Sequence, residues 1–369
     1  MKKFDFPAVA GTLSRGTTLL GLLLMLLACS EMPATVAAVS QPQTTPVALT
    51  ADTLKVVSLN IAHGRKDGIN QLLLSGSTIR KNLDEIATVL GDSGADIVAL
   101  QEADAPSRWS RNFDHIAMLA AQADYPAVVH TPHARSWPFN YGTAILSRTA
   151  FTETINHTFE PSPPTLNKGF TLAQFVWRPH GEQQASVLLD VVSVHLDFSR
   201  KQVRESQIRE NTRVLEGRDN ALIILGDFNS DWLADELVDR ALANDNGLKG
   251  YRPDADDLGT YPSGNKRLDW ILISETLEFI SYEVMPDMLS DHKAIIAEIG
   301  LAEQSQSRDA GMNPHTTRLT VRGANKRLGE YFHAFIKTFL TAGPCFTAGG
   351  LCHAVEQADR SPAIDRATG

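Results

Sequence analysis

Cysteine is scarce in this chain, with three residues among 369. Three cysteines are too few to hold together a small disulfide-stabilised scaffold. Positive charge is also in short supply, because 34 lysines and arginines face 43 aspartates and glutamates and leave a formal net charge of -9. We therefore do not expect a broad basic surface that grips a polyphosphate chain, although a local basic patch is compatible with these numbers.

The rest of the composition is that of an ordinary soluble protein. Hydrophobic residues make up 43% of the chain, which is too much apolar material for disorder throughout. The 25 glycines and 18 prolines follow no fixed period, which excludes collagen-like and tandem-repeat architectures. One large domain, or one domain with appendages, fits the length.

The first 29 residues are typical of a signal peptide. Lys2, Lys3 and Arg15 supply positive charge, and the apolar run from Leu19 to Ala28 is about ten residues long, whereas a spanning helix needs roughly twenty. The run ends in Leu-Leu-Ala-Cys, which resembles the bacterial lipobox and implies that Cys29 carries a lipid.

A lipid on Cys29 would anchor the protein in the bacterial cell envelope. Ser30 favours the outer membrane, by resemblance to other lipoproteins. The alternative is a soluble periplasmic or secreted protein whose Cys29 leaves with the signal peptide.

Composition divides the remainder into three parts. Residues 30–51 are rich in Pro, Thr, Gln, Ala and Val and are expected to form a flexible tether. Residues 52–300 are expected to form the folded domain, and residues 301–369 a linker and a tail of unknown role. In the tail we expect a helix over Leu328–Leu340, and Cys345 and Cys352 could pair in an oxidising compartment.

Strand-like and helical patterns alternate within the folded domain. The periodicity of Ile79, Leu83, Ile86 and Leu90 predicts a helix with Ser77 or Thr78 as its N-cap, and Val203–Leu215 is a second candidate. Strands mixed with helices over this length indicate a layered α/β domain. The predicted strands are Lys55–Asn60, Asp96–Leu100, Ala144–Ser147, Val187–His195, Ala221–Leu225, Trp270–Ile273 and Ala294–Ile299.

Polar residues follow or precede these strands repeatedly, while the strand interiors stay apolar. This order of carboxylate, amide and imidazole predicts one rim of the fold lined with polar groups. The motifs are Leu59-Asn60, Gln101-Glu102, Gly142-Thr143-Ala144-Ile145-Leu146-Ser147-Arg148, Val194-His195-Leu196, Gly226-Asp227-Phe228-Asn229, Arg267-Leu268-Asp269-Trp270 and Ser290-Asp291-His292.

In this order the motifs resemble those of the endonuclease/exonuclease/phosphatase superfamily, over roughly residues 54 to 300. Its members include pancreatic-type DNases, exonuclease III-like abasic-site nucleases, neutral sphingomyelinases and inositol polyphosphate 5-phosphatases. The resemblance implies a four-layered α/β/β/α sandwich (DNase I-like), with the active site at one rim of two packed sheets. It also implies a hydrolase that cleaves phosphate esters with the help of Mg²⁺ or Mn²⁺, ions that prefer oxygen ligands.

The resemblance gives each polar residue a role. Glu102 would bind the metal with Asn60 beside it, and Asp291 would reach the metal or a water molecule. Asn60 could instead be a turn-forming amide, and His195 could be a core residue rather than a phosphate donor.

The remaining implied roles are catalytic. Asp227 would orient or deprotonate water, or protonate the leaving oxygen, and Asn229 would donate to the phosphoryl oxygens. His292 would act as general acid/base or phosphate contact, with Asp269 accepting a hydrogen bond from its other ring nitrogen. His195 would be a second phosphate donor.

The substrate is less well defined. We expect a small organophosphate or a lipid headgroup, bound by a monomer that is attached to a membrane by its lipid. An exported nuclease is the alternative, but abasic-site nucleases carry an acidic residue where this chain has Ala62 and an aromatic one where it has Asn140. A third hypothesis is a non-catalytic envelope binding protein, although such a protein would be expected to lose Glu102, Asp227 or His292, and all three are present.

Overall fold

The computed structural model describes residues 39–40, 48–179, 181, 185–231 and 247–302. The predicted signal peptide, most of the predicted tether and the tail lie outside the described residues, so the structure does not test the expectations for Cys29, Leu328–Leu340, Cys345 and Cys352. The chain divides into two units, residues 1–304 and residues 305–369, and all described residues belong to the first.

Two β-sheets make up the centre of the domain. The seven-stranded sheet has the order β1 (Val39–Ser40), β4 (Ala127–Ser136), β5 (Phe139–Ser147), β3 (Ile97–Asp104), β2 (Leu54–Asn60), β13 (Ile295–Leu301) and β12 (Leu277–Val284). The six-stranded sheet has the order β10 (Leu248–Gly250), β11 (Asp269–Ser274), β9 (Ala221–Asp227), β8 (Val187–His195), β7 (Gly169–Trp177) and β6 (Glu153–Thr158).

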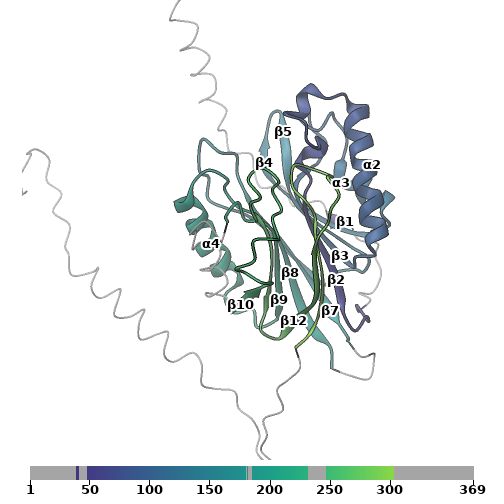
Figure 1. The fold of residues 1–369 in the computed structure, drawn as a ribbon, viewed down its shortest axis with the longest axis vertical. Coiled ribbons are helices and arrows are strands. Elements are labelled where there is room, and N and C mark those ends of the chain that lie inside the picture. Colours follow the sequence, from purple (N-terminus) through teal and green to yellow (C-terminus); the bar gives the residue numbers. More distant parts are fainter. Residues whose placement is uncertain (1–38, 41–47, 180, 182–184, 232–246, 303–369) are drawn as a thin grey trace, which may run out of the picture. The chain divides into compact units, whose positions relative to one another are not determined.

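Helices cover the outer faces of both sheets (Figure 1). Helices α2 (Gly76–Ser93) and α3 (His115–Gln122) share an apolar cluster with the first sheet, and α4 (Lys201–Leu215) shares one with the second. A third cluster fills the space between the sheets. Neighbouring strand residues alternate between clusters, as Val56 and Val57 do, because successive side chains point to opposite faces. The predicted α/β/β/α sandwich is confirmed.

Helix α2 begins earlier than the sequence predicted. Its apolar face is buried as expected, but the N-cap is Ser75, whose Oγ accepts a hydrogen bond from the backbone N–H of Thr78 at 3.1 Å. Ser77 and Thr78 were the wrong choice because they already lie in the first turn, whereas Ser75 has the extended backbone that an N-cap requires.

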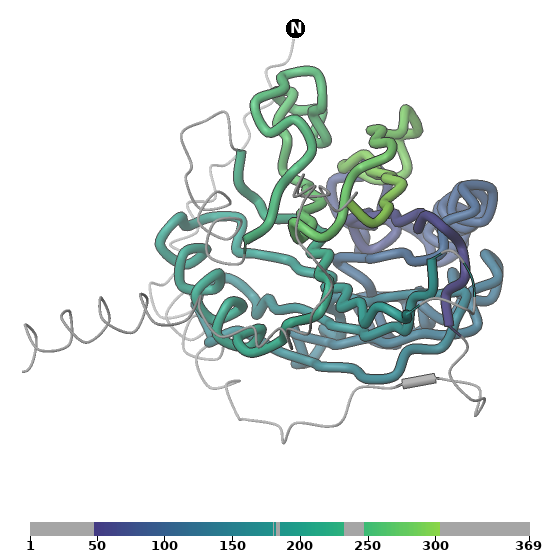
Figure 2. Tube along the Cα trace, turned by 90° about the horizontal axis from the view of Figure 1, so that it is seen from below, coloured from purple at the N-terminus to yellow at the C-terminus, as the bar shows by residue number. Residues whose placement is uncertain are grey.

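Strand direction gathers the polar residues at one rim. Each sheet contains one parallel pair, β2 with β3 and β8 with β9, and each pair is connected through a helix. The strands next to these pairs are antiparallel to them and so start where the pairs end. Figure 2 shows the last segment of the domain, in yellow-green, beside the first, in purple, as the pairing of β13 with β2 requires.

Part of the predicted tether lies against the domain. Val39 and Ser40 pair with β4, and Leu49 is buried and hydrogen-bonded to the backbone of β7. Among the described residues no helix combines the length and the apolar character needed to cross a membrane.

Candidate active site

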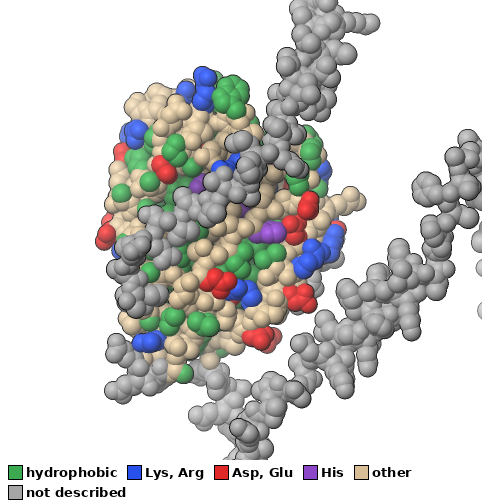
Figure 3. All heavy atoms as spheres, turned by 180° about the vertical axis from the view of Figure 1, so that it is seen from behind, with side chains coloured by type: hydrophobic (Ala, Val, Ile, Leu, Met, Phe, Trp, Pro, Cys, Tyr) green, Lys and Arg blue, Asp and Glu red, His purple; other side chains and the backbone are tan. Residues whose placement is uncertain are grey.

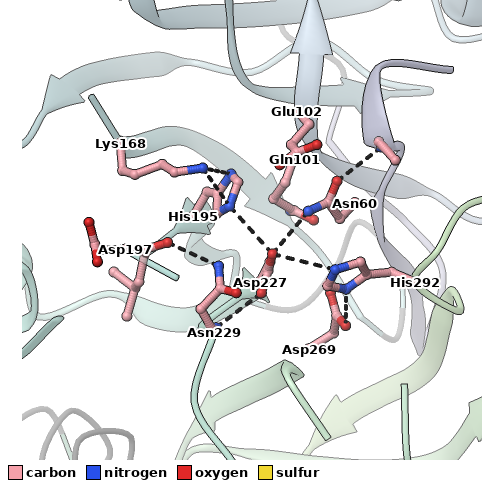
Figure 4. Close-up of polar contacts among 12 residues, drawn as sticks. Asn60, Gln101, Glu102, Lys168, His195, Asp197, Asp227, Asn229, Asp269 and His292 are labelled. Atoms are coloured by element: carbon pink, nitrogen blue, oxygen red, sulfur yellow. Dashed lines mark hydrogen bonds and ion pairs between the residues drawn. The ribbon is translucent and has the colours of Figure 1, made fainter. Parts of the chain in front are cut away.

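The strand register brings the predicted site residues together. His195, Asp227 and Asp269 are Cα partners on the adjacent strands β8, β9 and β11, and Asn60 at the end of β2 is paired with Gln101 of β3. Histidine side chains come to the surface among hydrophobic and charged ones on the face drawn in Figure 3. Figure 4 shows that the side chains from the seven-stranded sheet, such as Asn60, point toward those from the six-stranded sheet, such as Asp227.

Asp227 lies at the centre of the site. Its Oδ2 accepts a hydrogen bond from Nδ2 of Asn60 at 2.9 Å, which joins the two sheets, and its Oδ1 accepts one from the backbone N–H of Asn229 at 3.0 Å. The ring Nε2 atoms of His195 and His292 lie 3.4 and 3.9 Å from Oδ2. Burial raises the pKa of Asp227 to about 6, against the opposing effect of His292, so the group changes its charge close to neutral pH.

Asp269 and His292 form a buried pair, as the sequence reading expected. Oδ2 of Asp269 lies 2.8 Å from Nδ1 of His292, and the two side chains are 1% and 8% exposed. Burial alone would lower the pKa of His292, but the carboxylates of Asp269 and Asp227 outweigh it and raise that pKa to about 10. His292 is therefore a cation at neutral pH, with its Nε2 directed toward Asp227.

Glu102 is turned toward the rim by a local irregularity in β3. The pairing of β3 with β5 shifts register between Leu100 and Ala103, and Glu102 has a positive φ of 51°, a conformation that costs energy for a non-glycine residue. Burial would raise the pKa of Glu102, but the charges of His63 and Lys168 outweigh it and lower the pKa to about 2. The side chain is therefore an anion at any working pH.

His63 is a site residue that the sequence reading missed. Its Nε2 lies 3.2 Å from Oε2 of Glu102, and its Nδ1 lies 2.8 Å from Oδ2 of the buried Asp104. The rings of Trp109 and Tyr141 pack edge-on against the imidazole and fix its plane. Burial opposes protonation of His63, but Asp104 and Glu102 together raise its pKa. The imidazole therefore links the Glu102 carboxylate to the buried Asp104 carboxylate.

Lys168 was missed as well. It is buried, and its Nζ lies 2.9 Å from Nε2 of His195. Burial, and next the charge of Lys168, hold the pKa of His195 well below its usual range, so the imidazole is neutral. Lys168 stands directly before β7, a strand that the sequence did not predict. Had that strand been recognised, Lys168 would have been identified as a polar residue at a strand end, as the other site residues were.

Two predicted residues have protein partners of their own. Nδ2 of Asn229 donates to the carbonyl of Leu196 at 3.1 Å, and the carboxylate of Asp291 forms an ion pair with Arg65 at 2.5 Å. Asn60 likewise uses both ends of its amide, because its Oδ1 accepts from the backbone N–H of Ala62 at 3.0 Å. Asn60 thus lies against Asp227, at the end of the strand that pairs with the Glu102 strand, β3.

Comparison with known proteins agrees with this arrangement. The sequence profile described as "Endonuclease/Exonuclease/phosphatase family" matches residues 57–292, from the first strand of the site to its last histidine. This chain belongs to that family. It is therefore one of a superfamily of phosphoesterases and nucleases whose members generally depend on divalent metals. No curated protein matches the sequence.

Solved structures share the family's fold with this chain. An endonuclease/exonuclease/phosphatase from Beutenbergia cavernae DSM 12333 has 18% identity and a TM-score of 0.51, covering 68% of this chain and 72% of that one. One from Bacteroides vulgatus has 17% identity and a TM-score of 0.52, covering 68% and 99%. The human Nocturnin catalytic domain with bound sulfate has 17% identity and a TM-score of 0.50, covering 69% and 97%.

The donor set is consistent with the divalent metal of this family. Glu102 offers an ionised, partly exposed carboxylate, a hard oxygen donor of the type that Mg²⁺ prefers. Asp227, Asp269 and His292 also lie close enough to surround an ion, with ligand atoms within 4.8 Å of one another. In that second cluster Nδ1 of His292 is occupied by Asp269, so the ring could offer only Nε2 to an ion.

Proposed function

We propose that this protein is a metal-dependent phosphoesterase that uses water to cleave a phosphodiester or phosphomonoester bond. The observation that carries the proposal is the position of Asp227, a buried carboxylate with a pKa of about 6 that lies among the side chains of Lys168, His195 and His292. A carboxylate that titrates near neutral pH is suited to move a proton at the pH at which it works.

In the proposed mechanism Asp227 takes the proton from the attacking water. Asn60 and the backbone N–H of Asn229 hold the carboxylate in one orientation, so no reorganisation is needed when the proton moves. Protonation of Asp227 removes the base, and activity should fall as the pH drops through about 6.

The cations would stabilise the charge that develops on the phosphoryl oxygens. His292 is protonated below a pH of about 10 and is held by Asp269, so at neutral pH it is suited to donate a hydrogen bond, not to act as a base. Lys168 contributes a second nitrogen donor, with a pKa that burial lowers, and the neutral His195 a further ring nitrogen. Fixed donors at such positions commonly account for several kcal/mol of a reaction barrier, on the order of 3 kcal/mol each.

We assign the metal to Glu102, with Asp291 as the other carboxylate offered by the resemblance, and expect Mg²⁺ or Mn²⁺. When bound, such an ion polarises the phosphoryl group and neutralises its charge. His63 and Asp104 would keep the Glu102 carboxylate in place, since partners behind a ligand orient it.

Small organophosphates or lipid headgroups are the favoured substrates, and a lipid on Cys29 would hold the enzyme at a bacterial membrane. The net charge of -9 argues against a long nucleic acid. The solved Nocturnin domain, which has a bound sulfate anion, is compatible with a tetrahedral anion as ligand of the shared fold.

A hydrolysis panel tests the proposal. The protein would be stripped with EDTA and assayed with Mg²⁺, Mn²⁺ or Ca²⁺ on bis-p-nitrophenyl phosphate, p-nitrophenyl phosphate, plasmid DNA, sphingomyelin and phosphoinositides. We expect EDTA to abolish turnover, Mg²⁺ or Mn²⁺ to restore it, and Asp227→Asn to remove it.

The matched control is Asp190→Asn, a buried carboxylate on β8 that is paired with Arg218 and is remote from the rim. Full activity after exhaustive chelation would contradict the metal assignment. A preference for plasmid DNA over every small ester would favour the exported nuclease.

A further inference from the structure

Exposed apolar side chains are concentrated at the rim that carries the active site. Nine large apolar side chains are exposed among the described residues, and Leu188 and Ile280 are the two that lie elsewhere. Single exposed apolar residues are ordinary, but a concentration at one end of a domain marks a contact surface. The seven rim residues are Ile69, Leu72, Leu73, Trp137, Leu166, Phe198 and Met288, here called the apolar tips.

Strand direction places all seven tips at this rim. β2 and β8 end at the site, so the segments that follow them, with Ile69 to Leu73 and with Phe198, lie there. β5, β7 and β13 run the opposite way and start at the site, so the segments before them, with Trp137, Leu166 and Met288, lie there too. Three tips are exposed to an unusual degree: Ile69 by 95%, Trp137 by 79% and Leu73 by 77%.

Hydrogen bonds hold these segments in place below the tips. The guanidinium of Arg111 donates to the carbonyls of Leu72 and Leu74 at 2.6 and 2.7 Å, and the backbone N–H of Trp109 donates to the carbonyl of Pro138 at 3.2 Å. On the second sheet, Asp197 accepts a hydrogen bond from Thr165 at 2.6 Å, which joins the segments of Phe198 and Leu166. The exposure of the tips therefore belongs to ordered segments with internal partners.

Basic side chains stand beside the tips, although the chain as a whole is acidic. The guanidinium of Arg108 lies over the ring of Trp137, 5.6 Å from its centroid. Acidic residues are as numerous in these segments, and two of them, Asp197 and Asp291, form ion pairs with Arg200 and Arg65. The basic residues of these segments are Arg65, Lys66, Arg108, Arg111, Arg200 and Lys201.

We infer that the apolar tips are a docking surface for a lipid bilayer, which places the active site at the level of the lipid headgroups. The tips come from five segments of two sheets around the site, so a peptide lying in one groove would not contact them together, whereas a bilayer surface would. Apolar side chains at such a rim suit the boundary between the headgroups and the acyl chains of a bilayer. The inference rests on the proposed function and narrows its substrate to a membrane-embedded phosphate ester.

The test compares rim variants with matched variants elsewhere, all in the full chain carrying Cys29→Ala, which is the parent here, so that no N-terminal lipid binds the vesicles. The rim variant carries Ile69→Ser, Leu73→Ser and Trp137→Ser; the control carries Leu188→Ser and Ile280→Ser. None of the five residues belongs to the proposed catalytic machinery. Binding is measured by sedimentation with vesicles of phosphatidylcholine alone and of phosphatidylcholine mixed with phosphatidylglycerol.

We expect the parent and the control to bind the mixed vesicles and the rim variant to bind at least about tenfold more weakly, from the apolar area withdrawn from the lipid. Hydrolysis of the vesicle phospholipid should fall to the same extent. Hydrolysis of the soluble bis-p-nitrophenyl phosphate should stay within about twofold of the parent in all variants, because the chemistry does not use the tips.

Each other outcome has a definite meaning. Equal vesicle binding by the rim variant and the parent overturns the inference. A parent that cleaves the soluble ester but binds no vesicle overturns the inference and leaves the proposed function standing. Vesicle binding that depends on the tips without cleavage of any ester overturns the proposed function alone. Loss of binding to plasmid DNA, with vesicle binding unchanged, would identify the rim as a nucleic-acid surface and overturn the lipid assignment.

Discussion

Replacing Asp269 by Asn isolates the contribution of one charge to the active site. The amide oxygen of Asn can still accept the hydrogen bond from Nδ1 of His292 at 2.8 Å, so the change removes the charge and keeps the shape. A hydrogen bond to a charged partner contributes about 1.5–3 kcal/mol, roughly one to two pKa units. The pKa of His292, about 10 in the parent, should therefore fall to about 8–9.

Two measurements follow this change. The Cε1–H resonance of His292, assigned with His292→Gln, gives its pKa directly, and kcat should fall by about two to four decades. The effects of Asp269→Asn and His292→Gln on kcat should be strongly non-additive, because the two residues act as a unit. Multiplicative losses in the double variant would show that they act separately.

The free energy of unfolding should also depend on the Asp269–His292 pair, and its change with pH has a definite sign. The folded pKa of His292 is raised above its ordinary value, so the stabilisation is fully present below about pH 6.5 and is lost as the pH rises through about 10. Urea unfolding should therefore show a gap between parent and Asp269→Asn that is widest at low pH and narrows toward pH 10. Asp190→Asn serves as control and should leave the titration of His292 unchanged. A histidine that titrates identically in parent and Asp269→Asn would refute the reasoning.

Three further predictions concern the metal, the tail and the N-terminus. His63→Gln should weaken Mn²⁺ binding about 10- to 100-fold in calorimetry, whereas His133→Gln, a buried histidine outside the site, should not; equal affinities would show that His63 does not orient Glu102. Deletion of residues 305–369 should leave folding and kcat largely intact, and an insoluble product would show that the tail packs on the domain. An alkyne fatty acid should label the parent, which detergent and not salt releases, and should not label Cys29→Ala; a soluble, unlabelled parent would instead indicate ordinary secretion.

The predictable part of the fold is the part in which local pattern and burial agree. Strands such as Ala221–Asp227 are apolar runs closed by a polar residue, and most of them were found with errors of one or two residues. The predicted strands Asp96–Leu100 and Ala144–Ser147 were shorter than β3 and β5, by four residues at the end and by five at the start. β4 was missed because two histidines and a proline interrupt its apolar pattern, and β12 because it is an edge strand with mixed exposure. The compositions of these two strands permit other structures.

The sequence predicted which residues belong to the site better than it predicted the contacts between them. The pairing of Asp269 with His292 followed from the family resemblance, but the bond from Asn60 to Asp227 joins residues of different sheets and depends on how the sheets pack. His63 lies on a three-residue helical turn with a left-handed backbone, which nothing in its neighbours signals. Contacts of this kind arise from tertiary structure, so a periodicity analysis does not contain them.

The pairing of β2 with β13 has a consequence for the order of folding. These two strands, the first and the last of the site, are separated by most of the domain in sequence, and His292 stands just before β13. Closing so long a loop is entropically expensive and is expected to be slow. A chain interrupted before residue 292 would possess Asn60, Glu102 and Asp227 and still have no complete site. The protein is thus expected to be inactive throughout synthesis, until β13 pairs with β2.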